Sequence, residues 1–142
     1  MSGLKQVFSS AGPIRETREV ITDTDPATGI VTAEEWHKDG QLDRTDGPAI
    51  IWRDPATGTV TMEVWSKNGK LDRADGAAIV ERNAATGTVT REEWCKDDHL
   101  DRADGPALIE RDAATGTVTR EEWWKDDKQI APSSPAGNPA PG

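Results

Sequence analysis

Paired glutamates are the first residues of this chain whose type and spacing could do chemistry. They occur at Glu34-Glu35, Glu92-Glu93 and Glu121-Glu122, and two neighbouring carboxylates can share the acid and base roles of a catalytic site. Adjacent residues of a β-strand point to opposite faces, however, so a strand would split each pair. A catalytic pair also needs one distinct environment, whereas this pair recurs with the repeat. We therefore predict a solvated or salt-bridged sheet face, and no catalytic pair.

The sequence Asp-Arg-x-Asp-Gly offers repeated carboxylates that could bind calcium, and it begins at Asp43, Asp72 and Asp101. Ca²⁺ takes about 6–8 oxygen ligands in proteins. Each copy supplies two carboxylates separated by an arginine, and no glutamate follows at the spacing of an EF-hand loop. We predict that these aspartates pair with the local arginine and cap a turn, and that the chain binds no metal.

The two histidines and the single cysteine are too few for a zinc site with four such ligands. Cys95 and His99 are four residues apart, but a nucleophilic dyad also needs an orienting partner and an oxyanion site. At the Cys95 position the other copies carry His37, Ser66 and Trp124, a variety that is typical of a tolerant surface position. We predict no catalytic residue and no cofactor, so the protein is not expected to be an enzyme.

Tryptophan is the most distinctive residue type of the chain, with six copies and no tyrosine. Four tryptophans recur every 29 residues, at Trp36, Trp65, Trp94 and Trp123. An aromatic ladder of this kind could bind sugars or peptides. We expect these four instead to be buried against the recurring leucines, Leu42, Leu71 and Leu100. Trp52 and Trp124 do not recur, so they are the better candidates for contact with a partner.

The elements that position these residues belong to a repeat, because a fixed period of this size indicates a repeat architecture. Each copy holds two runs rich in Thr, Val, Ile and Trp, such as 78–82 and 88–95, and such runs predict strands. No window has a helical period. Connections of two and five residues force neighbouring strands to be antiparallel. The sequence therefore predicts an all-β fold, an antiparallel β-meander of 29-residue hairpin repeats.

The loop between the two strands of a copy, Asp54 to Gly58 in one case, leaves two pairing registers open. A four-residue loop would pair Asp54 with Thr59, and a five-residue loop would pair Arg53 with Thr59. The choice decides whether Ile50 or Ile51 shares the face of the tryptophan that follows. Turn chemistry favours the first register, whereas the placement of opposite charges in another copy favours the second.

Two segments, WHKDGQLDRTDGPAII at 36–51 and WSKNGKLDRADGAAIV at 65–80, resemble the MORN-variant repeat family. The shared pattern is an aromatic residue, Lys, Asn/Asp-Gly, Lys/Gln-Leu, a polar link and Asp-Gly-Pro-Ala, and the resemblance covers about 14–129. It implies a meander of hairpins in a single curved or rod-like sheet, used mainly for protein contacts and sometimes for lipid contacts. Some bacterial members look like antitoxin or immunity partners.

Length and composition bound the remaining possibilities. The 142 residues suffice for one domain, which we divide into a loose lead at 1–13, a repeat domain of about four copies, the first partial, at 14–130, and a disordered tail at 131–142. A net charge of −9 argues against binding to nucleic acid or to an anionic membrane. No apolar run reaches transmembrane length, and a single cysteine fits a reducing compartment, so we expect a cytoplasmic protein.

These observations predict a non-enzymatic protein-interaction module, whose antitoxin or immunity form is implied by the resemblance. The predicted contact residues are two tryptophans and three strand glutamates: Trp52, Trp124, Glu35, Glu93 and Glu122. Equivalent residues of successive copies should lie roughly 9–10 Å apart, close to the Debye length of about 8 Å. Their charges would then merge into an acidic stripe, and the partner would have a basic contact face. The alternative is a carbohydrate- or peptide-binding surface that uses exposed tryptophan.

Overall fold

The computed structural model describes residues 2–9 and 17–131, and this part of the chain contains strands and turns but no helix. It therefore contains no helix long and apolar enough to cross a membrane. The strands are β1 (Ser2–Ser9), β2 (Thr17–Thr24), β3 (Val31–Lys38), β4 (Gln41–Leu42), β5 (Ile50–Arg53), β6 (Val60–Val64), β7 (Ser66–Lys67), β8 (Lys70–Leu71), β9 (Ile79–Arg82), β10 (Val89–Glu93), β11 (Cys95–Lys96), β12 (His99–Leu100), β13 (Leu108–Arg111), β14 (Val118–Lys125) and β15 (Lys128–Ile130).

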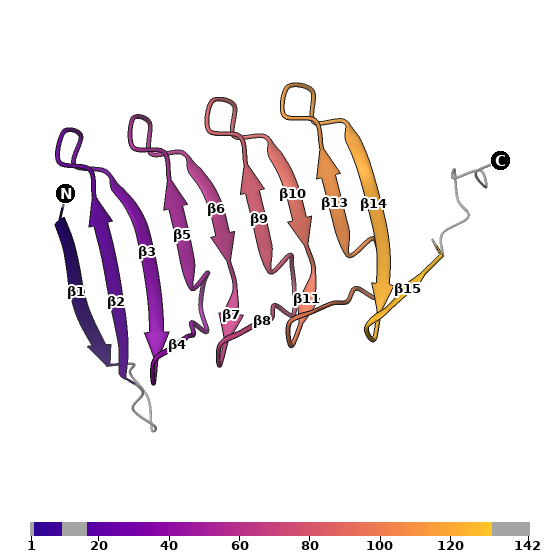
Figure 1. The fold of residues 1–142 in the computed structure, drawn as a ribbon, viewed down its shortest axis with the longest axis horizontal. Helices are drawn as coiled ribbons and strands as arrows, with labels where there is room; N and C mark the ends of the chain where they lie inside the picture. Colours follow the sequence, from indigo (N-terminus) through magenta and orange to yellow (C-terminus); the bar gives the residue numbers. More distant parts are fainter. Residues whose placement is uncertain (1, 10–16, 132–142) are drawn as a thin grey trace.

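One main sheet runs the whole length of the molecule (Figure 1). Its order is β1-β2-β3-β5-β6-β9-β10-β13-β14-β15, with β4 paired to β3, and the short hairpins β7–β8 and β11–β12 form small sheets of their own. Neighbouring strands of the main sheet are antiparallel throughout. The predicted all-β antiparallel meander is confirmed.

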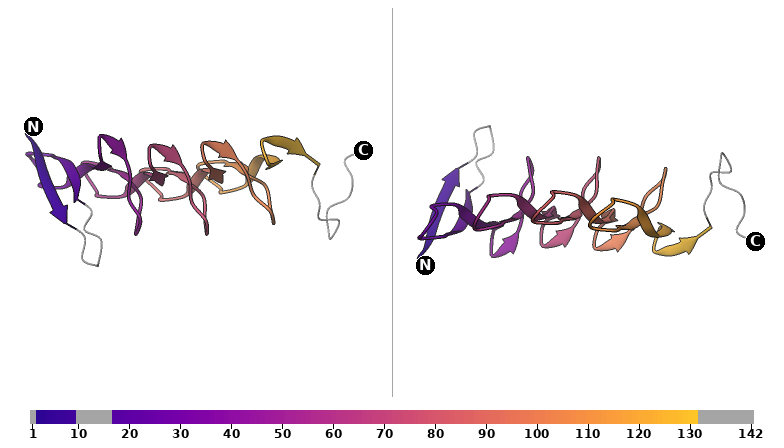
Figure 2. Two further views of the ribbon diagram at one scale, coloured as in Figure 1. Left: turned by 90° about the horizontal axis from the view of Figure 1, so that it is seen from below. Right: turned by 90° about the horizontal axis from the view of Figure 1, so that it is seen from above.

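The molecule is elongated along the direction in which the strands follow one another, and it is thin in the views down the strands (Figure 2). Its buried apolar residues are mostly small or aliphatic, and no large side chain of the described residues is fully buried. Each strand therefore contacts little beyond its immediate neighbours. In such an architecture stability depends mainly on the interfaces between successive copies.

The loop after β5 is closed by its first residue. The Asp54 carboxylate accepts hydrogen bonds from Ala56 N–H at 3.0 Å and Thr57 N–H at 2.9 Å, and Gly58 N–H donates to Asp54 O at 2.8 Å. The bonds from Thr57 are the main reason that the pKa of Asp54 lies below its ordinary value. Gly58 has a φ of 81°, which favours glycine. The same bonds recur at the three equivalent loops, which begin at Asp25, Asn83 and Asp112.

The turn itself follows the first of the two predicted registers, because Asp54 N–H donates to Thr59 O at 2.8 Å. The pairing then shifts by one residue, from Arg53 opposite Val60 to Trp52 opposite Met62. The extra residue is Thr61, whose hydroxyl donates to Trp52 O at 3.3 Å. A threonine therefore forms a β-bulge here.

The bulge changes which isoleucine shares the face of the next tryptophan. Beyond it, Ile51 lies opposite Glu63 and Ile50 lies opposite Val64. Side chains alternate along a strand, so Glu63 and Trp65 share a face, and Ile51 joins them. The hydrogen bond at the turn is therefore that of the first predicted register, whereas the isoleucine on the face of Trp65 is that of the second. Neither predicted alternative contained this combination.

The N-terminal residues differ from the loose lead predicted for 1–13. Residues Ser2–Ser9 form β1, which pairs with β2 from Ser2 opposite Thr24 to Ser9 opposite Thr17. The first copy therefore gains an additional strand at its outer edge. Apart from Ala131, the predicted tail at 131–142 lies outside the described residues.

Candidate interaction surfaces

The Asp-Arg-x-Asp-Gly loop is built around a stacked arginine. The guanidinium carbon of Arg73 lies 3.9 Å from the ring centroid of Trp65, and Arg73 also donates to Asp75 at 3.4 Å and to Ala77 O at 3.1 Å. A Cβ on Gly76 would lie 2.5 Å from the guanidinium carbon, so the glycine leaves the space that the arginine fills. Arg44 on Trp36 and Arg102 on Trp94 repeat the stack at 4.0 and 3.7 Å.

The first aspartate of each loop caps the hairpin of the following copy. Asp72 accepts a hydrogen bond from Asp97 N–H at 3.1 Å, and the equivalent pairs are Asp43 with Asn68 N–H at 2.8 Å and Asp101 with Asp126 N–H at 3.0 Å. The predicted Asp–Arg pairing and turn capping are confirmed, with the difference that the capped turn belongs to the next copy. Among the described residues no three His, Cys, Asp or Glu side chains are grouped as a metal site.

Asp43 is the most buried of these carboxylates, with 2% of its surface exposed. Burial alone would raise its pKa, but the bond from Asn68 N–H and the ion pair with Arg18 at 2.8 Å outweigh this effect. The pKa of Asp43 is therefore lowered. This carboxylate joins three segments of the chain, β2, its own loop and the hairpin that contains Asn68, so its role is structural.

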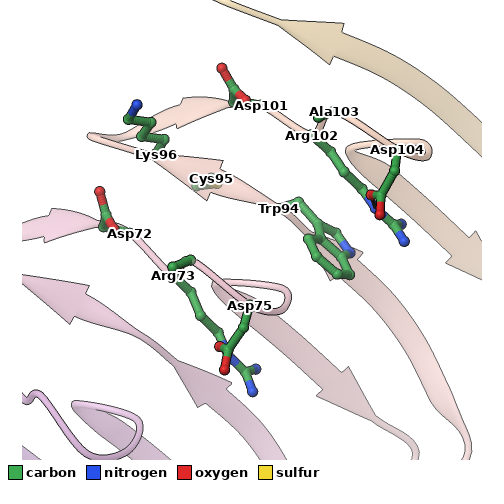
Figure 3. A pocket seen from close by; sticks show the side chains of 11 residues that line it. Asp72, Arg73, Asp75, Trp94, Cys95, Lys96, Asp101, Arg102, Ala103 and Asp104 are labelled. Atoms are coloured by element: carbon green, nitrogen blue, oxygen red, sulfur yellow. Dashed lines mark hydrogen bonds and ion pairs between the residues drawn. The ribbon is translucent and has the colours of Figure 1, made fainter.

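The stacked arginines line hollows between successive loops, one of which is shown in Figure 3. One hollow of about 590 Å³ lies between the loops at 72–75 and 101–104, over Trp94. A second of about 430 Å³ lies between the loops at 44–46 and 72–75. Both are lined by aspartate carboxylates together with arginine and lysine, so neither has a dominant charge. The rings at their base are half-buried. An arginine covers each of these rings, so they do not form a bare aromatic ladder.

Cys95 does not occupy a tolerant surface position, and that prediction is wrong. Its exposed fraction is 3%, and the equivalent Ser66 is exposed by 4%. The connection from the preceding copy covers this position, because Ser66 donates to Leu42 O at 3.1 Å and Cys95 O accepts from Arg73 N–H at 3.2 Å. Burial, followed by the charges of nearby carboxylates, raises the pKa of the Cys95 thiol to about 12. The thiol is therefore protonated and unreactive at neutral pH.

The glutamate pairs are split between the two faces of the sheet, as predicted. Glu34 forms an ion pair with Arg53 at 2.7 Å, whereas Glu35 lies opposite Ile50 on the other face and contacts His37 at 3.2 Å. Each of the two carboxylates therefore has its own partner. They form a salt-bridged surface and do not converge on one reacting group.

The five predicted contact residues share one face of the main sheet. The pairing register puts a single row of side chains directly across the sheet, Glu35, Ile50, Val64, Ile79, Glu93, Leu108 and Glu122. Trp52 is two residues beyond Ile50 and Trp124 two residues beyond Glu122, so both tryptophans point to the same face as this row. We call this surface the Trp52 face.

The acidic charge of the Trp52 face is interrupted and partly compensated. Val64 stands between Glu35 and Glu93 in the row, which puts these two carboxylates four strands apart, roughly 19 Å. Glu93 and Glu122 are two strands apart, but they form ion pairs with Arg91 and Arg120. These glutamates therefore form separate ion pairs with arginines, and they do not form the continuous acidic stripe that the sequence predicted.

The apolar part of the Trp52 face lies toward the N-terminal end of the sheet. Trp52 is 46% exposed and lies opposite Ala33 on one side and Met62 on the other. Ile21, on the same face, is 39% exposed. Trp124, by contrast, is half-buried and donates from Nε1 to Glu122 at 2.9 Å. Trp52 is the more accessible of the two predicted contact tryptophans.

No known family model, curated protein or solved structure matches this chain. The resemblance to MORN-variant repeats therefore rests on the sequence motif alone.

Proposed function

We propose that this chain is a non-enzymatic protein-interaction module and that it binds its partner through the Trp52 face. The observation that carries the proposal is the 46% exposure of Trp52, which lies opposite Met62 on the face that also carries the exposed Ile21. Large apolar side chains that the scaffold leaves uncovered are typical anchors of an interface. The contrast with Trp36, Trp65 and Trp94 supports this role, because each of those rings carries a stacked arginine.

The charged part of the face defines the rest of the partner. Glu93 and Glu122 lie in the same row as the apolar residues, and the chain carries a net charge of −9. A partner with an apolar pocket for Trp52 and basic residues nearby would match both regions, and association with it should slow as salt rises. Nucleic acid and anionic membranes, which repel this charge, are not proposed as partners. An antitoxin or immunity role in the cytoplasm is the specific form that the motif resemblance favours.

The test compares variants of Trp52 in the whole protein. Immobilised wild-type protein and Trp52→Ser are used to capture a partner, which is then purified and titrated against both. Ile130→Ser is the matched control, because Ile130 is 40% exposed at the far end of the sheet. We expect Trp52→Ser to abolish binding and Ile130→Ser to preserve it. A partner that binds Trp52→Ser as tightly as wild type would contradict the proposal.

The exposure of Trp52 also favours a second candidate, a carbohydrate-binding surface, since a bare indole can stack on a sugar ring. Tryptophan fluorescence during titration with glycans separates the two. A saturable glycan response that is absent in Trp52→Ala would favour sugar binding, whereas a response to the purified protein partner alone would favour the first proposal.

A further inference from the structure

The last long strand of the sheet has an open edge. In the interior, Arg91, Glu92 and Glu93 of β10 pair with β9 on one side and with β13 on the other. Within the part of the chain that the structure describes, the equivalent stretch of β14, Val118 to Glu122, pairs only with β13, because β15 begins its pairing at Trp123. We call the unpaired side of residues 118–122 the open edge. Unpaired backbone N–H and C=O groups along a strand are a template for another strand.

The exposure of the β14 side chains shows that none of the described residues covers this edge. Residues 118–121 of β14 are exposed, whereas the equivalent residues 89–92 of β10 are all half-buried. Val118 alone is 43% exposed. The strand sequence is nearly unchanged between the two copies, so the difference comes from the missing neighbour.

The interior of the molecule shows which side chains seal such an edge. In the sheet, each second strand of a copy is followed by a segment that has alanine just before the strand, then two aliphatic residues, one further residue and a final arginine, at 49–53, 78–82 and 107–111. Its arginine pairs with a glutamate of the strand it covers. The three pairs are Arg53–Glu34 at 2.7 Å, Arg82–Glu63 at 2.6 Å and Arg111–Glu92 at 2.5 Å.

A second charge pair gives the covering strand of the last interior copy its register. Glu110, which precedes Arg111, pairs with Arg91 at 2.7 Å. The open edge presents the same two charges in the same order, Arg120 and Glu121. Glu121 is exposed, and it forms no ion pair within residues 17–131. A covering strand with Glu-Arg at its end would complete both pairs.

We propose that the open edge binds an extended segment of a partner protein as an added antiparallel strand with the pattern Ala-aliphatic-aliphatic-Glu-Arg. Backbone hydrogen bonds would supply much of the affinity, and the Glu-Arg dipeptide would set the register. The inference is independent of the Trp52 face, because it concerns the edge of the sheet and a different set of residues.

A second copy of this chain fits the edge less well. The strand that ends in Glu110-Arg111 is β13, and it is paired on both sides within its own sheet. The outer strand at the other end, Ser2–Ser9, has the sequence SGLKQVFS and contains no Glu-Arg dipeptide. Another protein is therefore the occupant that matches the charges of the edge.

The experiment uses the full chain and a synthetic peptide that copies residues 105–112, GPALIERD. Binding is followed by amide chemical shifts and by calorimetry. We expect the peptide to shift the amides of 118–122 and to leave those of β10 unchanged. Ile109→Pro in the peptide should abolish binding, because proline cannot donate within a ladder. Arg111→Glu in the peptide, or Glu121→Arg in the protein, should each weaken binding roughly tenfold, and the two together should restore it.

Glu35→Arg is the matched control, since it makes the same charge change on the Trp52 face at a distance from the edge. It should leave peptide binding unchanged. The proposal is overturned if the peptide fails to shift residues 118–122, or if the charge-swapped pair binds no better than either single change. Protection of these amides in the free protein that increases with its concentration would also overturn it, in favour of pairing between copies.

Discussion

The copy that contains Trp94 and the copy that contains Trp123 have almost the same sequence but different surroundings. The ring of Trp94 carries Arg102 at 3.7 Å, and the backbone N–H of Trp94 donates to Ala107 O at 2.7 Å. Both partners come from the chain that follows it. After Trp123, Ile130 and Ala131 stand where Asp101 and Arg102 would be expected from the spacing. Among the described residues, the final copy therefore lacks both the stacked arginine and the covering strand.

This difference shows that a copy is completed by its successor. Glu92 is paired with Arg111 and has a side chain 20% exposed, whereas Glu121 is exposed. Local sequence determines the strands and turns, whereas the following copy supplies the stacked arginine, the arginine that pairs with the strand glutamate, and the strand that covers the edge. Nearest-neighbour dependence of this kind is expected for repeat proteins.

The first copy extends the comparison, and it leads to the largest expected effect. Asp43 pairs with buried Arg18 in addition to capping the next hairpin, whereas Asp101 accepts one backbone bond, from Asp126. Asp43→Ala should cost about 3–5 kcal/mol, because it removes one partner of a buried ion pair. Asp101→Ala should cost about 1 kcal/mol. Urea denaturation of both variants measures the difference, and equal costs would refute it.

The same carboxylate gives a pH dependence with a defined sign. The folded-state pKa of Asp43 lies below its unfolded value, which is about 3.9. The unfolded state therefore binds the proton more tightly, so the stabilisation is present above about pH 4 and is lost as the pH falls through the folded pKa. We expect the stability gap between wild type and Asp43→Ala to narrow below about pH 4. A gap that stays constant there would contradict the assignment.

Substitution of the tryptophan in an interior copy and in the last copy tests how much the following copy contributes to stability. Trp94→Ala should destabilise the protein by about 3 kcal/mol, the low end of the range for loss of a large aromatic, because the ring is half-buried. Trp123→Ala should cost clearly less, since none of the described arginines stacks on it. Denaturant midpoints compared at equal m-values provide the measurement. Equal losses would show that the following copy contributes little to tryptophan packing.

The loop that the last copy lacks can be tested through its glycine. Gly76→Ala places a Cβ 2.5 Å from the guanidinium carbon of Arg73, so the arginine must leave Trp65. We expect a cost of about 1–3 kcal/mol, typical of overpacking. In an Arg73→Ala background the added methyl meets no guanidinium, and the cost should largely disappear. A double-mutant cycle in urea gives this coupling, and additive effects would exclude it.

The sequence predicted the fold well because short turns with strong glycine and aspartate signals leave few ways to connect strands. It selected Trp52 and Trp124 because they do not recur and the three glutamates because they do, but it did not predict that all five share one face of the sheet, which follows from the observed register. It did not predict the bulge at Thr61. Threonine is common in strands, and no sequence pattern distinguishes a threonine whose hydroxyl bonds to the opposite carbonyl.

The stacked arginine and the buried cysteine were also missed, for different reasons. The spacing of eight residues between Trp65 and Arg73 recurs at Trp36 and Trp94, so a signal existed, but the intervening leucine was the more obvious apolar partner. For Cys95 the variety of residues in other copies indicated tolerance. That position is covered by the connection from the preceding copy. A comparison of equivalent residues between copies gives no information about this cover.

The amides of Glu92 and Glu121 provide the most direct test that each copy is sealed by its successor. Trp94 N–H faces β13, so Glu92 N–H, two residues earlier, faces β13 as well, and the equivalent N–H of Glu121 faces the open edge. Residue-resolved hydrogen exchange on the free protein should show Glu121 exchanging orders of magnitude faster than Glu92. Equal protection of the two amides in the monomer would contradict the claim.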